Sequence, residues 1–368
     1  MKQSNFFSVR IFSVVAILFV MLPLSAQTQI EPFVPGATIE GVSYFLPRTA
    51  LRVVITAEKT KIIPGEYHMY AYKYMRLQDV PNQVSVTWRI KDIKMLSFGV
   101  PDKSKAYSLK IKGHTTAPLV SLSSEGLLLG INTDVEEITL PALSPSRIIE
   151  TAITPTQVRA CMTRDMLQAS SMAKIAELAA REIYDIRESR DALVRGEADN
   201  TPKDGAQLKL MLDNIDSQQQ MLYSLFVGSR EVSEHTFAID VVPGEEHDKL
   251  LLFRFSKWLG LVDADDMSGT PYYLSIKSCG ELPEPVADPK TDKAKAKLQR
   301  AVYYNVPARS EVRIFNADET FVKAELPIAQ FGFVDILSNQ LFDKMGNTRV
   351  SFFQATGGVK EIKTQSQE

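Results

Sequence analysis

The sequence of 368 residues has no strong excess of either charge. Its formal net charge at pH 7 is −2, and its hydrophobic content of 45% is that of an ordinary globular protein. A nucleic-acid-binding surface needs a basic field, so the charge balance argues against nucleic acid as a partner. A chain of this length should divide into two or more structural units.

Cysteine is nearly absent: the sequence contains two, Cys161 and Cys279. Two cysteines cannot form a zinc site made of thiolates alone, and these two lack the C-x-x-C spacing of a redox motif. A Cys161–Cys279 disulfide would be permitted in an oxidising compartment, and two separate buried thiols are the alternative. The sequence does not decide between them, because a disulfide depends on three-dimensional geometry.

Motifs of catalysis and of nucleotide binding are missing as well. The chain contains no G-x-S-x-G nucleophile turn, no G-x-x-x-x-G-K-[ST] phosphate loop and no G-x-G-x-x-G fingerprint. None of the histidines shows H-x-x-x-H or H-E-x-x-H spacing, and we interpret them as surface or turn residues: His68, His114, His235 and His247. We therefore expect no catalytic residue, no metal site and no cofactor, and the sequence favours a protein that is not an enzyme.

One acidic segment, DADDMSG at 263–269, has the density of oxygen atoms that a calcium ion needs. An EF-hand loop would place a Glu at its twelfth position, and that position is Leu274 in this sequence. We interpret the segment as an acidic β-turn.

The N-terminus has the order of a signal peptide. Lys2 and Arg10 are basic, 11–22 is an apolar run too short for a bilayer, and Ser25 and Ala26 are small. We predict a signal peptide over 1–26 with cleavage after Ala26, and hence an exported protein that is periplasmic, on the cell surface or secreted. An uncleaved anchor is the alternative. No later segment approaches about 18 apolar residues, so we expect no transmembrane segment in the mature chain.

An N-terminal β domain is predicted over 27–150, with an extended lead-in at 27–40. Short β-branched and aromatic runs alternate with turn signals there, as in VSYFLP, LRVVITAEKT and QVSVTWRIKDIKMLSFGV. The stretch IIPGEYHMYAYKYMRLQD fits a strand or a helix. Pro64 and Gly65, together with the Ala, Met and Leu content, favour a short helix.

A long helical hairpin is predicted over 151–229, because apolar residues recur there at spacings of three and four. The two stripes are Met172, Ile175, Ala179, Ile183, Ile186 and Leu193, and then Leu208, Met211, Leu212, Ile215, Leu222 and Leu225. The link GEADNTPKDG is a turn, in which Thr201 is the expected cap of the second helix, and Gly228 is the expected stop. Each helix should be about 30 Å long, and the two should pack on each other and on one flank of the β units.

A C-terminal β domain is predicted over 230–362, where strand signals such as HTFAIDVV, LLFRFS and PYYLSIK return. The segment 282–300 is predicted to be an exposed excursion, and 363–368 a disordered tail. YFLPRTALRVVI at 44–55 resembles YNVPARSEVRIF at 304–315, and SEGLLLGI at 124–131 resembles TGGVKEI at 356–362. Duplication of a β domain would explain these matches, and so would chance similarity between strand-forming sequences.

Tyrosines are the candidates for ligand binding, namely Tyr67, Tyr70, Tyr74, Tyr272 and Tyr273. An aromatic ring can stack on the apolar face of a sugar, and tyrosine adds a hydroxyl. Packing in a core or at a sheet edge is the commoner use of such residues. A glycoside hydrolase would also need two carboxylates in a cleft, which the sequence does not single out among 44 acidic residues.

Many short segments, taken in order, resemble one family of exported Bacteroidetes proteins that is known only as a domain of unknown function. The segments are the leader, YFLPRTALRVVITAEKT, PGEYHMYAYKYM, APLVSLSSEGLLLGIN, LVRGE, LYSLFVG, LLFRFSKWLGLV, SGTPYYLSI, PIAQFGFVDIL and QATGGVKEI. The resemblance covers nearly all of the mature chain. It implies an envelope or secreted protein of about this length, and it implies no activity, cofactor or catalytic residue.

We therefore expect an α+β fold in which two mainly antiparallel, sandwich-like β domains flank a long antiparallel helical hairpin. The function that we expect is that of a non-catalytic, exported interaction or scaffold protein of the cell envelope, with the hairpin as a rigid spacer or docking arm. Its partner would be an envelope protein or a glycan. A carbohydrate-binding protein or a glycoside hydrolase is the alternative.

Overall fold

The computed structural model describes residues 42–109, 120–199, 202, 204–280, 282, 302–337 and 348–364. The predicted signal peptide over 1–26 and the lead-in at 27–40 lie outside the described residues. So do His114, most of the predicted excursion at 282–300, and 365–368. Lys363 and Thr364, which the sequence analysis assigns to a disordered tail, form the end of strand β13.

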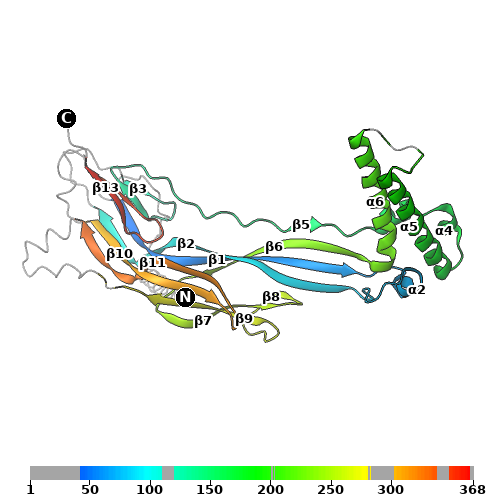
Figure 1. Ribbon diagram of the computed structural model, residues 1–368. Coiled ribbons are helices and arrows are strands. Elements are labelled where there is room, and N and C mark those ends of the chain that lie inside the picture. Colours follow the sequence, from blue (N-terminus) through cyan, green and yellow to red (C-terminus); the bar gives the residue numbers. More distant parts are fainter. Residues whose placement is uncertain are drawn as a thin grey trace, which may run out of the picture. The chain divides into compact units, whose positions relative to one another are not determined.

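Long β-branched segments become strands, and within the described residues these strands form three antiparallel sheets (Figure 1). The first sheet has the order β2-β1-β6-β5. Its strands are β1 at Val42–Ile63, β2 at Ser85–Leu109, β5 at Arg147–Glu150 and β6 at Ser229–Val241. β1 pairs with β2 on one side and with β6 on the other, so it is the central strand.

The second sheet has the order β11-β10-β9-β7-β8. Its strands are β7 at His247–Ser256, β8 at Gly260–Val262, β9 at Thr270–Ser278, β10 at Val302–Phe315 and β11 at Thr320–Leu337. The third sheet, in the order β13-β12-β4-β3, is built from short strands. They are β3 at Val120–Leu122, β4 at Leu128–Ile131, β12 at Thr348–Phe352 and β13 at Val359–Thr364.

The central strand β1 shows why the first two sheets share a core. Leu51, Val53, Ile55 and Ala57 alternate along β1 and are fully buried, as a strand with one covered face requires. They pack against a set of residues from the second sheet: Phe253, Phe255, Tyr272, Leu274, Ile276, Val312, Ile314 and Ile328. Apolar packing between two antiparallel sheets therefore forms the main core, in agreement with the expected α+β class.

A polar network ties β1 to β11 at the edge of this core. The Thr49 backbone N–H donates to Gln330 Oε1 at 2.8 Å, and Gln330 Nε2 donates to the Thr49 carbonyl at 2.8 Å. The Thr49 hydroxyl donates to the Ala355 carbonyl and accepts from the Ala329 N–H, each at 3.0 Å. Gln330 thus pairs with β1 as a neighbouring strand would, at the point where the register of β11 against β10 shifts.

Strands from both sides of the helical segment share two of the three sheets that the described residues form. β1 lies beside β6 in the first sheet, and β4 lies beside β12 in the third. The described part of Ile39–Glu368 belongs to one compact unit. The boundaries 27–150 and 230–362 stay a prediction from the sequence, and the pairing of strands does not follow them.

The repeated sequence pattern has a counterpart in the structure. The register of β1 shifts between Phe45 and Pro47, and that of β10 shifts on either side of Pro307. The N–H of Phe45 donates to the Gly126 carbonyl at 2.9 Å, and the N–H of Asn305 donates to the Gly357 carbonyl at 3.2 Å. Near its start, each of β1 and β10 thus donates a backbone hydrogen bond to the turn of a short hairpin. A duplication predicts such a correspondence.

The two long helices appear where the spacing of three and four occurs, and shorter helices accompany them among the described residues. They are η1 at His68–Tyr70, α2 at Ala71–Met75, α3 at Pro155–Ala160, α4 at Arg164–Gln168, α5 at Met172–Arg195 and α6 at Gly205–Val227. The helices α5 and α6, called the helical pair from here on, lie side by side (Figure 1). The short helix expected near Tyr67 is confirmed as η1 and α2.

The caps of the helical pair differ in part from the prediction. Gly196 ends α5 in the left-handed conformation, and Gly228 ends α6 as expected. The cap of α6 is Asp204, whose side chain accepts from the Ala206 N–H at 3.1 Å. Thr201, the predicted cap, lies outside the described residues, and α6 starts at Gly205 because Asp204 supplies a side-chain acceptor directly before it.

Two backbone segments cross at the base of the helical pair, where α6 runs into β6. The N–H of Tyr67 donates to the Leu225 carbonyl at 2.7 Å. A Cβ at Gly65 would overlap the Leu225 carbonyl, and a Cβ at Gly228 would overlap the Ile63 carbonyl. Gly228 also has φ +80° and ψ −168°, a conformation that is essentially restricted to glycine. The approach of β1 and η1 to the end of α6 therefore depends on two residues that lack a side chain.

Gly228→Ala should lower the free energy of unfolding by about 2–4 kcal/mol, because the new Cβ meets both backbone strain and the Ile63 carbonyl. Gly196→Ala is the matched control. Its φ is also positive, at +72°, but a Cβ there would meet nothing within 4 Å, so the expected loss is about 1 kcal/mol. Urea unfolding of both variants gives the comparison. Equal losses of unfolding free energy in the two variants would show that the close backbone contact at Gly228 does not limit stability.

Candidate functional site

The base of the helical pair is filled by an apolar cluster, called the base cluster from here on. Its buried members come from the residue before η1, from α2, α3 and α4, and from both long helices. They are Tyr67, Ala71, Met75, Val158, Met166, Ala176, Ala179, Ala180, Ile183, Leu222, Leu225 and Phe226. The rings of Tyr67 and Phe226 meet edge to face with their centroids 6.3 Å apart. Small alanines on α5 let the surrounding helices approach closely, so this end of the pair is fixed.

The outer part of the helical pair is largely uncovered. Every residue of α6 before Leu222 is partly or fully exposed, and Leu193 is the buried residue of α5 beyond Ile183. Val194 is 58% exposed and Leu210 is 61% exposed. Arg190 Nε donates to Asp216 Oδ1 at 2.6 Å and holds the two helices together at this level. The outer part is thus an ordered helical surface with apolar residues in solvent.

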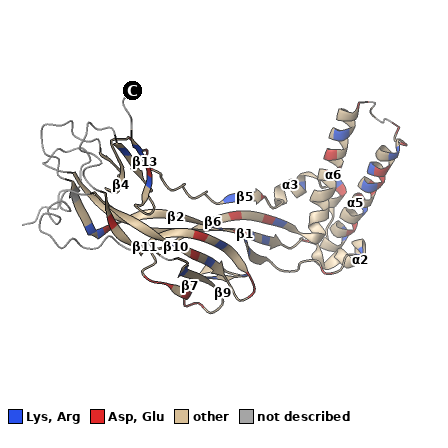
Figure 2. Cartoon of the chain, turned by 60° about the vertical axis from the view of Figure 1, so that its left-hand side comes forward, with Lys and Arg blue, Asp and Glu red and all other residues tan. Residues whose placement is uncertain are grey.

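The two helices differ in charge, as Figure 2 shows. α5 carries a charged residue on nearly every turn, whereas the charged residues of α6 are Lys209, Asp213 and Asp216. The uncharged exposed residues of α6 include Leu210, Asn214, Gln218 and Gln220. The exposed surface of the pair is therefore highly charged on α5 and mostly uncharged on α6.

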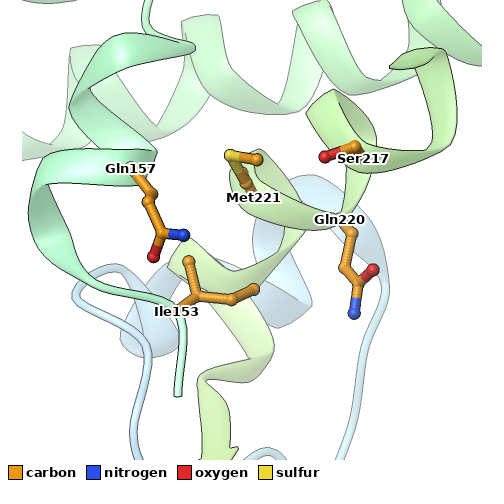
Figure 3. Close-up of a pocket in the computed structure, with 5 residues that line it drawn as sticks. All are labelled: Ile153, Gln157, Ser217, Gln220 and Met221. Atoms are coloured by element: carbon orange, nitrogen blue, oxygen red, sulfur yellow. The ribbon is translucent and has the colours of Figure 1, made fainter. Parts of the chain in front are cut away.

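A small hollow of about 190 Å³ lies between α3 and α6. Its lining residues are Ile153, Gln157, Ser217, Gln220 and Met221. Figure 3 shows Gln157 on one side of the hollow, Ser217 and Gln220 on the α6 side, and Ile153 and Met221 between them. None of the five can ionise, so the hollow combines uncharged hydrogen-bonding groups with two apolar side chains.

Gln157 is held in place by the start of α3. Thr154 caps this helix, and its N–H and its hydroxyl both donate to Gln157 Oε1 at 2.8 Å. The Gln157 N–H in turn donates to the Thr154 hydroxyl at 3.3 Å. These contacts are a capping box, and they fix which end of the side-chain amide is the oxygen. The sequence analysis did not single out Gln157, although T-P-T-Q at 154–157 is the signal of such a box.

Neither cysteine forms a disulfide, and both are free. Cys161 follows α3 and is half-buried, with its Sγ 3.2 Å from the Met221 Sδ. Burial raises the pKa of the Cys161 thiol, so the reactive thiolate is disfavoured. Cys279 is exposed at the end of β9. The alternative of two separate buried thiols therefore does not hold for Cys279.

The tyrosines proposed for sugar binding lie in two separate clusters. Tyr67, Tyr70 and Tyr74 belong to the base cluster or pack against it, and Tyr67 is 2% exposed. Tyr272 is 8% exposed and stacks on Phe253, with centroids 4.6 Å apart. Lys249 Nζ lies 4.2 Å from the centroid of the Tyr273 ring. The five tyrosines do not form one platform, and the two buried rings serve packing.

The acidic segment at 263–269 connects β8 to β9. Asp266 Oδ1 accepts from the Ser268 N–H at 2.8 Å, and the Gly269 N–H donates to the Asp266 carbonyl at 3.3 Å. These bonds are those of a turn, in agreement with the preferred interpretation. Within the described ranges, no group of three or more His, Cys, Asp or Glu side chains is placed to hold a metal ion.

His235 of β6 makes a contact that the sequence did not suggest. Its Nδ1 lies 2.9 Å from the Ser146 Oγ, and its Nε2 lies 3.0 Å from the Ser233 Oγ. A serine nucleophile needs a histidine base that is supported by a carboxylate, and here the second partner is a neutral hydroxyl. Burial and the nearby Lys59 lower the pKa of His235, which disfavours the imidazolium further. We interpret the contact between His235 and Ser146 as one that joins β6 to the segment before β5.

The stability of the chain should fall between pH 7 and pH 5 in part because of His235. A folded-state pKa below the unfolded value of about 6.5 makes proton binding favour the unfolded state as the pH falls through that value. Above it the imidazole is neutral in both states, and the effect vanishes. Urea unfolding at both pH values should show a smaller loss for His235→Gln than for the wild type. An equal loss in both proteins would contradict this role.

Among the residues that the structure describes, no helix is both long enough and apolar enough to span a membrane. A family model whose description is a domain of unknown function (DUF4831) matches residues 40–360. No curated protein matches the chain, and no solved structure matches it.

Proposed function

Since the chain belongs to the family described as a domain of unknown function (DUF4831), which brings no activity with it, we propose a function from the geometry. The protein is a non-catalytic, exported interaction protein of the cell envelope, and its helical pair is the docking arm for a protein partner. The single observation that carries this proposal is the contrast between the buried base of the pair and its uncovered outer part.

The exposed apolar residues support docking. Val194 and Leu210 lie on the two helices of the pair in its outer part, and both are more than half exposed. A helical surface that is ordered by its base but leaves large aliphatic side chains in solvent has the properties of a helix-binding or groove-binding element. The Arg190–Asp216 ion pair joins the two helices at this level. Because both helices are already formed, less entropy is lost on binding than for a flexible segment.

The topology favours docking over the spacer role. β5 and β6, the strands that flank the helical segment in the sequence, are hydrogen-bonded neighbours in the first sheet. The pair is an insertion into one sheet, so it does not need to hold two bodies apart. Export is supported by the signal-peptide pattern over 1–26, in which basic residues precede the apolar run at 11–22.

Leu210→Glu should weaken capture of the partner by about tenfold or more, because a buried contact would have to accept a charge. Leu259→Glu is the matched control, because Leu259 is 60% exposed in the turn between β7 and β8, outside the helical pair. The measurement is quantitative cross-linking of the tagged full chain to envelope proteins, with both variants shown to unfold like the wild type. Retention of every cross-linked partner in Leu210→Glu would sink the proposal.

Deletion of 170–226 tests the same arm more severely. The expected result is loss of partner capture while the main core still unfolds cooperatively, because Leu51, Val53 and Ile55 pack on strands outside the deletion. A short glycine linker would join the two ends. Full partner capture by the deleted chain would count against the helical pair as the docking element.

A further inference from the structure

We propose that the hollow between α3 and α6 binds one uncharged sugar residue of a glycan. Its α6 residues, Ser217, Gln220 and Met221, belong to the outer part of the helical pair but lie nearer the base than Leu210 does. The inference does not depend on the docking of a protein at Val194 and Leu210. It rests on three features of the hollow: its neutrality, the fixed orientation of its Gln157 side chain, and its size.

The neutrality of the hollow excludes an ionic ligand. Its lining offers amides, a hydroxyl, a thioether and an aliphatic side chain, and no group that ionises. Asp216, the neighbour of Ser217 on α6, is engaged by Arg190 at 2.6 Å. A charged ligand would lose its hydration without gaining an opposite charge, and this loss is costly. A ligand rich in hydroxyl groups avoids it.

The Gln157 side chain is oriented before a ligand arrives. Thr154 uses Gln157 Oε1 as the acceptor of two hydrogen bonds, each 2.8 Å long. The side-chain nitrogen of Gln157 has no hydrogen-bond partner among the described residues, and Figure 3 shows it on the side that faces the hollow. Two N–H donors of fixed position are thus offered, opposite the Ser217 hydroxyl and the Gln220 amide.

The size and the apolar floor favour a sugar ring. A volume of about 190 Å³ is below the range of drug-sized pockets, so the hollow suits a ligand no larger than one ring. Ile153 and Met221 can receive the C–H face of a ring while the polar side chains reach its hydroxyls. A peptide strand would find no free backbone edge to pair with here, because the backbone of α6 already bonds within the helix.

The affinity should be modest, on the order of millimolar, because no aromatic ring lines the hollow to stack on the sugar. This result would differ from the tyrosine platform that the sequence suggested. The contacts come instead from a capping-box glutamine and from one face of α6.

NMR titration of the full ¹⁵N-labelled chain with the methyl glycosides of glucose, galactose, mannose and N-acetylglucosamine tests the proposal. At least one glycoside should shift the side-chain NH₂ signals of Gln157 and Gln220 saturably. Glucuronate should bind about tenfold more weakly than the corresponding neutral glycoside, because its charge finds no partner. Failure of all four glycosides to shift these signals would overturn the proposal, and so would equal binding of glucuronate.

Gln157→Glu is the sharpest variant, because glutamate keeps the acceptor for Thr154 but removes both N–H donors. It should weaken glycoside binding by about tenfold or more. Gln207→Glu carries the same change in the first turn of α6, about 15 Å along the helix from Ser217 at about 1.5 Å per residue, and should bind as the wild type does. Equal affinity of the two variants would contradict the assignment.

Two further measurements keep the test decisive. Ser217→Ala should weaken binding without touching the cap of α3, and it replaces Gln157→Glu if that variant does not fold. An uncharged peptide that contains Asn and Gln is the competing ligand. If it shifts the same signals while the glycosides do not, the hollow recognises protein and the proposal is wrong. Loss of glycoside binding with intact protein capture would leave the docking arm unaffected.

Discussion

The crossing of two backbone segments at Gly65 and Gly228 is the constraint on which the arrangement of helices and sheet depends. β1 ends and η1 begins where α6 passes into β6, so one short region fixes the base of the helical pair against the central strand. The N–H of Tyr67 bonds to the Leu225 carbonyl at this crossing. Side chains at the two glycines would separate the segments, and the base cluster would lose the packing of Tyr67 on Phe226.

This constraint divides the helical pair into two regions with different chemistry. At the base, alanines of α5 and large side chains of α6 are buried, and the helices are fixed by apolar packing. Beyond it, Arg190 and Asp216 form an ion pair between the two helices, and Val194 and Leu210 are exposed. The hollow beside α3 lies next to the fixed region, where Gln157 is oriented by a cap rather than by burial. Recognition is therefore expected on side chains that the base keeps in place.

The local elements follow from the sequence with few corrections. Apolar residues at spacings of three and four predicted α5 and α6, and β-branched runs predicted the strands, because both patterns reflect one covered face. The short helix near Tyr67 followed from its composition. The cap of α6 was placed too early, since Thr201 and Asp204 are both good caps. The candidate site could be predicted only in part. The T-P-T-Q pattern at 154–157 predicts a capping box, but no pattern in the sequence places this box near Ser217.

The sequence by itself determined the α+β class, the helical pair and the lack of a catalytic motif, because these depend on periodicity and on local residue types. Only the tertiary structure decided that β1 lies beside β6 and β4 beside β12. It also decided that Tyr67 and Tyr272 are packing residues, and that Gln157 and Ser217 line one hollow. Such pairings join residues far apart in the chain, and they are fixed by the shared burial of whole faces, which no local pattern encodes.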